Sequence, residues 1–215
     1  MDIHGLDGHQ VAIARGDMVE PIVFPGQFVL LDNKDTTPTN EDLIIAETEE
    51  GERYLRRFWH GTDRSLLLEA TNPTRPKQPV RLRGGKHKMR RVVGVLFKQA
   101  KLDEPRTAQE WEAAQLPGGW SVDVVGLRIR GTSMEPLVRE TQLVLVRKNE
   151  LQEVKKAALA CVDIADVGTV IKRCYPSDKE WVLCSINPND IEDPMRVKTQ
   201  DVLHAYPLVG VLFEL

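Results

Sequence analysis

Short runs of apolar and β-branched residues, separated by turn-forming residues, recur along the whole chain. Runs such as Gln27–Leu31, Arg53–Phe58 and Gln142–Arg147 have the length and composition of strands, and Gly, Pro, Asn and Asp residues punctuate them. Many short strands with frequent turns predict a mainly β, mainly antiparallel architecture. The other predicted strands are Asp42–Glu47, Ser65–Ala70, Arg91–Phe97, Val124–Ile129, Ala157–Ile164, Thr169–Cys174 and Glu180–Ser185.

The chain also repeats itself once. The run GDMVEP at residues 16–21 aligns with GTSMEP at residues 131–136, an offset of 115 (131 − 16). The Asn-Pro pair at 72–73 recurs at 187–188 with the same offset, and VGVLF at 93–97 recurs at 209–213 with an offset of 116 (209 − 93). Markers at a nearly constant offset indicate a tandem duplication of one β-rich unit.

The repeat predicts a first domain over residues 1–97, a linker over 98–120 and a second domain over 121–215. Within the linker, Thr107 and Glu110 have the spacing of a capping box, which predicts a short helix that continues to Gln115. The run PGG at 117–119 is expected to end it.

Composition narrows the class of protein. Among 215 residues, Lys+Arg number 29 and Asp+Glu 32, so the net charge of −3 excludes a polycation built to coat nucleic acid. The 41% of hydrophobic residues suffices for a packed core. No stretch approaches the ~20 apolar residues that span a bilayer, and the start, MDIHGLDGHQ, lacks the basic and apolar regions of a signal peptide. We therefore expect a soluble cytoplasmic protein that contacts no membrane.

The three cysteines, Cys161, Cys174 and Cys184, are an odd number without a C-x-x-C motif, which favours free thiols in a reducing compartment. The histidines form no ligand cluster, and no phosphate-binding glycine motif is present. The sequence therefore indicates neither a metal site nor a cofactor.

One serine and one lysine form the sharpest candidate site. Ser133 lies in a Gly- and Pro-flanked turn after a predicted strand, where a hydroxyl and neighbouring N–H groups are exposed together, although most serines in turns have no chemical role. Lys172 lies within the apolar strand VIKRC, beside Val170 and Cys174. A lysine among apolar neighbours loses part of its preference for the charged form, and a neutral amine can act as general base for a serine nucleophile. The alternative is a lysine on a solvated strand face.

The order GTSMEP, LVLV, VIKR, SINP and VGVLF over residues 123–215 resembles the C-terminal domain of the LexA, UmuD and phage-repressor family of serine–lysine peptidases. The resemblance implies two tandem coiled β-sheet domains that form a pseudo-dimer. It also implies Ser133 as nucleophile, Lys172 as base and the backbone N–H groups of Thr132, Ser133 and Met134 as oxyanion donors. Members of this family cleave themselves when the RecA filament stimulates them during the SOS response.

The first half resembles the same family over residues 13–97 but departs from it at the site. Met18 stands at the serine position and Arg56 at the lysine position. Methionine has no hydroxyl, and arginine stays protonated and cannot serve as a base. The first half is therefore read as a degenerate copy, either a built-in partner for the second copy or a folded spacer.

Two features of the family are missing. No helix-turn-helix precedes the first β unit, so direct DNA binding is not expected. The Ala-Gly and Cys-Gly dipeptides at which the family cleaves itself are absent too. The bond between Ala100 and Lys101 lies at a suitable distance before Ser133, which leaves three alternatives: self-cleavage there, cleavage of a separate repressor, or no cleavage.

A basic segment offers a further alternative. Residues 75–91 contain eight cations and no acid: Arg75, Lys77, Arg81, Arg83, Lys86, Lys88, Arg90 and Arg91. They indicate either a patch for nucleic acid or an acidic partner, or a solvated hairpin that turns at Gly84-Gly85 and buries Val80 and Leu82. No aromatic residue for base stacking lies in the segment, which favours the hairpin.

The sequence thus leads to two functional hypotheses. The first is a serine–lysine peptidase of the LexA type in a stress or prophage response, whose protein substrate is its own chain or a partner repressor. The second is a catalytically silent module that binds a repressor or the RecA filament. The sequence leaves open whether two such chains form a homodimer.

Overall fold

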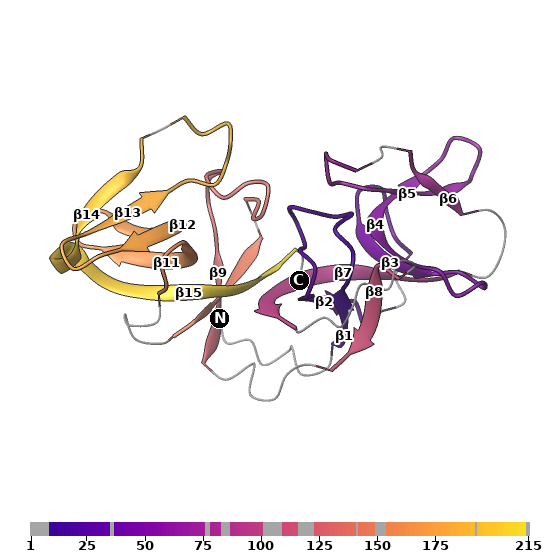
Figure 1. Cartoon of the computed structure of the whole chain (residues 1–215), viewed down its shortest axis with the longest axis horizontal. Coiled ribbons are helices and arrows are strands. Elements are labelled where there is room, and N and C mark those ends of the chain that lie inside the picture. The colour runs from indigo at the N-terminus through magenta and orange to yellow at the C-terminus, as the bar shows by residue number, and fades with distance from the viewer. Residues whose placement is uncertain are drawn as a thin grey trace. The chain divides into compact units, whose positions relative to one another are not determined.

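The computed structural model describes residues 9–34, 37–75, 78–82, 87–100, 109–115, 123–140, 142–148, 154–191 and 193–213. The chain divides into two compact units, Gly5–Gly118 and Gly119–Phe213, called the N-terminal and C-terminal units below (Figure 1). Both units consist of β-strands, and the described residues contain no α-helix. The prediction of a mainly β protein is confirmed.

The N-terminal unit is one antiparallel sheet with the strand order β8-β1-β2-β7-β3-β4-β5-β6. Four of the five predicted strands of this half lie within two residues of observed ones, and β7 is longer than expected. The strands are β1 (Gln10–Ala14), β2 (Gln27–Leu31), β3 (Leu43–Glu47), β4 (Arg53–His60), β5 (Leu66–Glu69), β6 (Val80–Leu82), β7 (Lys88–Gln99) and β8 (Trp111–Ala114).

The C-terminal unit repeats this sheet in the order β9-β10-β15-β11-β12-β13-β14, again antiparallel. A short 3₁₀ turn, Thr199–Asp201, precedes its last strand. The strands are β9 (Val124–Arg128), β10 (Leu143–Arg147), β11 (Ala158–Ile164), β12 (Gly168–Pro176), β13 (Glu180–Cys184), β14 (Met195–Lys198) and β15 (Val202–Leu212).

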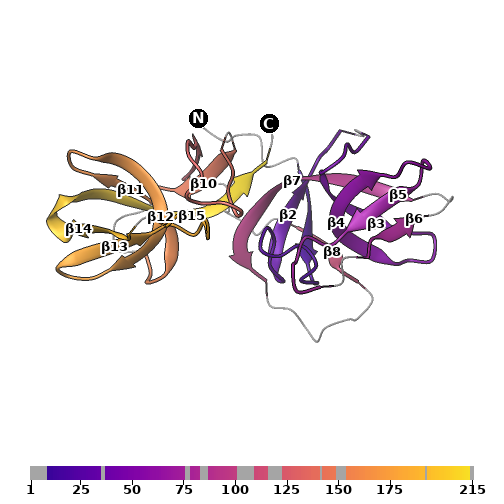
Figure 2. The same ribbon diagram turned by 90° about the horizontal axis from the view of Figure 1, so that it is seen from above.

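One long strand in each unit makes the sheet coil. The first half of β7 pairs with β3 and its second half with β2, and β15 pairs in the same way with β11 and then β10. Figures 1 and 2 show both strands as long, strongly bent ribbons. Register irregularities occur at corresponding points, next to Leu30 in β2 and Leu145 in β10. Such irregularities increase the local bend and twist of a strand.

The duplication extends to the register of the strands. Leu30 pairs with Gly94 in the first unit, and Leu145 pairs with Gly210 in the second. The strand pairing at the candidate lysine position is repeated as well. Arg56 lies opposite Ile44 in the first unit, and the residues at the equivalent positions of the second unit, Lys172 and Ala160, also lie opposite each other. The tandem duplication is therefore confirmed residue by residue. Association of the two copies as a pseudo-dimer stays a prediction.

The helix predicted for the linker is wrong. Trp111–Ala114 forms strand β8, which pairs antiparallel with β1 so that Ala113 lies opposite Ala12 and Trp111 opposite Ala14. Thr107, the expected cap, lies outside the described residues. A capping box is a weak local signal for a helix. Hydrogen bonds to the backbone groups at the outer edge of β1 stabilise this segment more strongly as a strand. The predicted linker also reaches into the first unit, which extends to Gly118.

The predicted basic hairpin is wrong in its pairing, although its burial pattern is right. Leu82 is buried and Val80 packs against the same core cluster, as expected from alternation. However, β6 pairs with β5 while β7 begins beside β3, and Gly84-Gly85 lies outside the described residues. Four of the eight cations have polar partners, and three of these partners are carboxylates, which reduces the charge left for an acidic ligand. The pairs are Arg75 with Asp17, Arg81 with Asp63, Arg90 with Gln10 and Arg91 with Asp32.

Each unit has a core cluster of its own. In the C-terminal unit, Leu183 and Trp181 of β13 pack with Val162 of β11 and Ala205 of β15. In the N-terminal unit, Phe58 of β4 takes the central place of the corresponding cluster. These side chains sit at alternate positions of their strands, which is the pattern that the sequence showed.

We expect Leu183→Ala to lower the free energy of unfolding by about 2–5 kcal/mol, because it leaves a cavity in a closed core. Leu183 is 1% exposed, whereas Leu203 in the same unit is 49% exposed. Leu203→Ala should therefore cost about 0.5 kcal/mol or less. Urea unfolding of the full chain, followed by far-ultraviolet circular dichroism, measures both. Equal losses would contradict the assigned core.

Candidate active site

The backbone around Ser133 is fixed by the loop that follows β13. The Ser133 carbonyl accepts hydrogen bonds from the N–H groups of Ile186 and Asn187, at 2.9 and 3.1 Å, and from the hydroxyl of Ser185 at 2.6 Å. The Asn187 side-chain amide donates to the carbonyl of Thr132 at 2.8 Å. Four hydrogen bonds therefore hold this turn, so the position of the Ser133 side chain is set by the fold.

The N–H groups in the same turn are available as donors. Within the described residues, the N–H groups of Thr132, Ser133 and Met134 donate to no protein acceptor. Gly131, at the start of the turn, has a φ of 86°, in the region that favours glycine. Adjacent free N–H groups beside a hydroxyl are what an oxyanion hole requires. Their assignment as oxyanion donors stays a prediction.

Lys172 lies in the middle of β12, opposite Ala160 of β11. Its neighbours on the same face of the strand, Val170 and Cys174, belong to the apolar core of the unit, and Cys174 is fully buried. Lys172 itself is half-buried. It takes part in none of the ion pairs found among the described residues. The lysine is thus placed among apolar neighbours, as the sequence predicted.

Ser133 and Lys172 line one cavity of about 510 Å³ in the C-terminal unit. β9 and the turn after it form one wall of the cavity, and the first half of β12 forms the opposite wall. The structure records no direct hydrogen bond between the Ser133 hydroxyl and the Lys172 amine in the part of the chain it describes. The lining residues are Leu127, Arg128, Ile129, Arg130, Gly131, Ser133, Met134, Cys161, Thr169, Val170, Ile171 and Lys172.

The first copy reproduces three of the four hydrogen bonds of this turn around Met18. The Met18 carbonyl accepts hydrogen bonds from the N–H groups of Thr71 and Asn72, at 2.9 and 3.0 Å. The Asn72 side-chain amide donates to the carbonyl of Asp17 at 2.8 Å. The hydroxyl bond from Ser185 has no equivalent, because residue 70 (185 − 115) is Ala70. The scaffold of the site is preserved although its nucleophile is absent.

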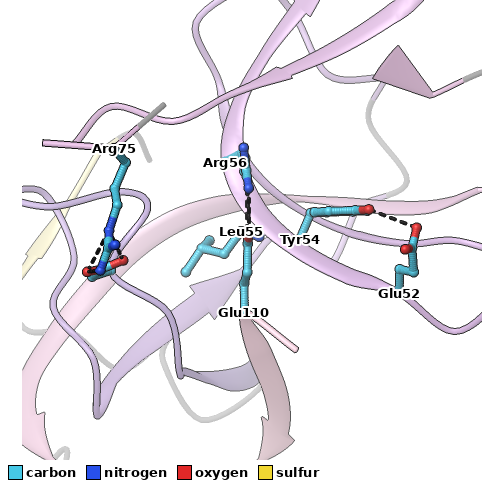
Figure 3. A network of polar contacts seen from close by, with 7 residues as sticks. Glu52, Tyr54, Leu55, Arg56, Arg75 and Glu110 are labelled. Carbon is cyan, nitrogen blue, oxygen red and sulfur yellow. Dashed lines mark hydrogen bonds and ion pairs between the residues drawn. The ribbon is translucent and has the colours of Figure 1, made fainter. Parts of the chain in front are cut away.

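At the lysine position of the first copy, Arg56 forms a buried ion pair. The Arg56 guanidinium binds the carboxylate of Glu110 through Nη2 at 2.7 Å and through Nε at 3.2 Å. The side chains of Arg56 and Glu110 are only 9% and 15% exposed. Figure 3 shows the two side chains end to end, with the backbone of Leu55 beside them. This site holds a carboxylate bound to an arginine, and it has methionine and arginine where the second copy has Ser133 and Lys172.

Both halves of the chain match one family model, described as Peptidase S24-like, over residues 7–97 and 100–205. The chain belongs to the Peptidase S24-like family. The two matched stretches coincide with the two sequence repeats, so the resemblance and the tandem duplication are confirmed. No significant match is found among curated proteins or among solved structures.

The two S24 copies differ in whether the groove beside the turn is filled. In the first copy a Cβ atom on Gly16 would lie 3.4 Å from the side chain of Glu110, whereas a Cβ on Gly131 would meet nothing within 4 Å. Gly16, Leu55 and Arg56 surround Glu110 in the first copy. Their counterparts in the second copy, at offsets of 115 for the glycine and 116 for the other two, all line the cavity. These counterparts are Gly131, Ile171 and Lys172. The cavity of the second copy is therefore the place that Glu110 occupies in the first.

The two buried thiols of the second S24 copy, Cys161 and Cys174, are no rival nucleophiles to Ser133. Cys161 lines the cavity, and burial, aided by the negative charge of Asp163, raises the pKa of its thiol to about 11. Burial likewise raises the pKa of Cys174 to about 12. A thiol with so high a pKa stays protonated near neutral pH and is a poor nucleophile. All three cysteines are free, as predicted; Cys161 and Cys174 are buried, whereas Cys184 is only half-buried.

Three residues of the two sites were not singled out as functional in the sequence. Ser185 and Asn187 hold the turn of Ser133, and their signal was the motif SINP, which was used only as a marker of the repeat. Glu110 was assigned to a helix cap, and no local pattern links it to Arg56.

The predicted cleavage site was the bond between Ala100 and Lys101. Lys101 lies outside the described residues, and the Ala100 N–H donates to the carbonyl of Gly26 at 2.8 Å.

In the described residues, no helix is long and apolar enough to cross a membrane.

We expect iodoacetamide at pH 8 to modify Cys184 well before Cys161 and Cys174. Cys184 is only half-buried, whereas a pKa of about 11 leaves the Cys161 thiolate at about one molecule in a thousand at this pH. Mass spectrometry of tryptic peptides over time measures the order. The urea-unfolded chain, in which all three thiols should react, is the control. Labelling of Cys161 as fast as that of Cys184 would contradict the assigned burial.

Proposed function

We propose that the second S24 copy is a serine–lysine peptidase that cleaves an extended peptide segment. Ser133 is the nucleophile, Lys172 is the general base, and the N–H groups of Thr132, Ser133 and Met134 bind the oxyanion. The observation that carries this proposal is that the Ser133 and Lys172 side chains line one open cavity and that no acidic partner binds Lys172 among the described residues. Membership of a peptidase family supports it.

The chemistry needs one proton carrier. Lys172, in its neutral form, takes the proton of the Ser133 hydroxyl while the oxygen forms a bond to the carbonyl carbon of the substrate. The free N–H groups of the turn stabilise the negative charge on the substrate oxygen. The lysine then gives its proton to the leaving nitrogen, the C–N bond breaks, and an acyl-serine remains. A water molecule, deprotonated by the same amine, releases the acid product and restores Ser133.

The proposal requires the Ser133 hydroxyl and the Lys172 amine to be in hydrogen-bond contact when substrate is bound. Catalytic hydrogen bonds commonly tighten only in the enzyme–substrate complex. The filled groove of the first copy supports an extended substrate. There a strand of the chain pairs with β1, the counterpart of β9, and brings a side chain to the Arg56 position. In the described residues β9 pairs with β10 alone, so its outer edge is open to a peptide.

The resemblance to LexA and phage-repressor peptidases supports regulatory proteolysis as the setting. Under this proposal the substrate is a partner repressor or another copy of the chain, and the RecA filament is the stimulus. The reaction would take place in the cytoplasm. Four of the eight cations of the basic segment already have polar partners, which is an argument against nucleic acid as the main ligand.

A silent binding module is the second candidate function. The observation in its favour is the first copy, which holds a strand of the chain at its site although it has no serine and no lysine at the two equivalent positions. If the second copy works in the same way, it binds a repressor segment or the RecA filament without cleaving it.

We expect Ser133→Ala and Lys172→Ala each to lower the rate of cleavage by about a thousandfold or more, because each removes one half of the catalytic pair. Lys172→Arg should be equally inactive, since arginine keeps the charge and cannot accept a proton. Ser177→Ala, which changes a serine in a turn remote from the cavity lining, should cleave as the unaltered chain does.

The assay incubates the full chain at mildly alkaline pH with a candidate repressor, with and without RecA filament, and detects fragments by mass spectrometry. Fragments that persist in Ser133→Ala would contradict the assigned nucleophile. The absence of fragments in every sample, together with binding of the repressor, would support the silent module.

A further inference from the structure

Strand β8 is the one strand of the N-terminal unit that has no counterpart in the described part of the second copy. It lies at the outer edge of the sheet and pairs antiparallel with β1, with Ala113 opposite Ala12 and Trp111 opposite Ala14. The residue before it, Glu110, donates its N–H to the carbonyl of Arg53 in β4 at 2.9 Å. Residues 109–114 therefore lie along a groove between β1 and β4.

Every polar group of Glu110 is bound. Its carbonyl accepts from the N–H groups of Arg15 and Gly16, at 2.8 and 3.3 Å. One carboxylate oxygen accepts from the N–H of Leu55 at 2.8 Å, and the other accepts from the Arg56 guanidinium at 2.7 Å (Figure 3). A buried carboxylate is costly unless it is paired and hydrogen-bonded. The groove therefore provides a complete set of donors for one glutamate.

The two residues that follow are recognised as well. The Trp111 ring is 8% exposed, its indole N–H donates to the carbonyl of Ala46 at 3.2 Å, and the guanidinium of Arg53 lies 4.9 Å from the ring centre. Glu112 accepts a hydrogen bond from Nε of Arg15 at 2.7 Å. Backbone pairing supplies affinity for any strand, and side-chain sites such as these supply specificity.

The donors occupy the positions of the catalytic groups of the other copy. Arg56 aligns with Lys172 and Gly16 aligns with Gly131, so the groove that takes Glu110 corresponds to the cavity that contains Ser133. Replacing lysine by arginine exchanges a titratable amine for a permanent planar cation, which binds a carboxylate through two nitrogens. The change that removes catalysis is thus the change that creates a carboxylate site.

We propose that the first copy is a peptide receptor specific for an extended Glu-Trp-Glu segment, and that its occupant is the chain's own residues 109–114. A strand that pairs with β1 is not free to pair with β9. The first copy therefore withholds this segment, which precedes the second copy in the chain, from the cavity of the second copy. This inference does not depend on whether the second copy is an active peptidase.

The first test follows hydrogen exchange of backbone amides in Glu110→Gln and Arg56→Met, which each remove one half of the buried ion pair. We expect exchange of the β8 amides to accelerate at least about tenfold, as for a loss of about 1.4 kcal/mol in local stability, while β2 and β3 stay protected. Asp63→Asn, which breaks the exposed Arg81–Asp63 pair in the same unit, is the matched control and should leave β8 unchanged. Unchanged β8 exchange in both variants, or loss of protection in β2 and β3 along with β8, would overturn the proposal.

The second test supplies the segment in trans. Glu110→Lys places a cation against Arg56 and should displace β8, so the variant should bind a fluorescein-labelled peptide of residues 107–116. The same peptide with Gln in place of Glu110 should bind at least about tenfold more weakly, and the unaltered chain, whose groove is filled, should bind neither. If the lysine variant does not fold, Glu110→Gln serves as acceptor. Equal affinities for the two peptides, or no binding to a folded acceptor, would overturn the receptor assignment.

Discussion

In each copy, the backbone groups at the outer edge of the first strand need hydrogen-bond partners, and this need governs the site beside them. Backbone N–H and C=O groups at a sheet edge require partners, from water or from another strand. In the first copy β8 supplies them to β1 and closes the groove. In the second, β9 pairs with β10 alone among the described residues, and a cavity of about 510 Å³ lies beside it. The same strand edge therefore borders a filled groove in the first copy and a cavity in the second.

The residue at the middle of the facing strand is the main difference between the two sites. Arg56 carries a permanent charge and binds the Glu110 carboxylate in an ion pair whose two side chains are 9% and 15% exposed. Lys172 occupies the same register position, has no acidic partner among the described residues and shares its cavity with Ser133. The turn that carries Ser133 or Met18 is held by equivalent hydrogen bonds in both copies. The two copies of the S24 fold therefore share the backbone frame of the turn and differ in the residues at the serine and lysine positions.

Much of this was readable in the sequence, because it rests on local patterns. Alternating apolar runs gave most strands to within two residues, and the offset between GDMVEP and GTSMEP gave the duplication. The assignment of Ser133 and Lys172 as a catalytic pair came from the resemblance and stays a prediction, although both residues line one cavity. The errors share a cause. Glu110 looked like part of a helix cap, and Val80 and Leu82 looked like one arm of a hairpin, because neither local pattern reveals which distant strand will be the partner.

The fold class, the repeat and the absence of a serine and a lysine at positions 18 and 56 could be read from the sequence, because they follow from the identity and spacing of residues. The place of Glu110, 54 residues from Arg56, in the site of the first copy became visible only in the folded chain. Strand pairing is long-range, and an edge selects its partner by hydrogen-bond geometry and by the burial that folding allows. No window of neighbouring residues contains that information.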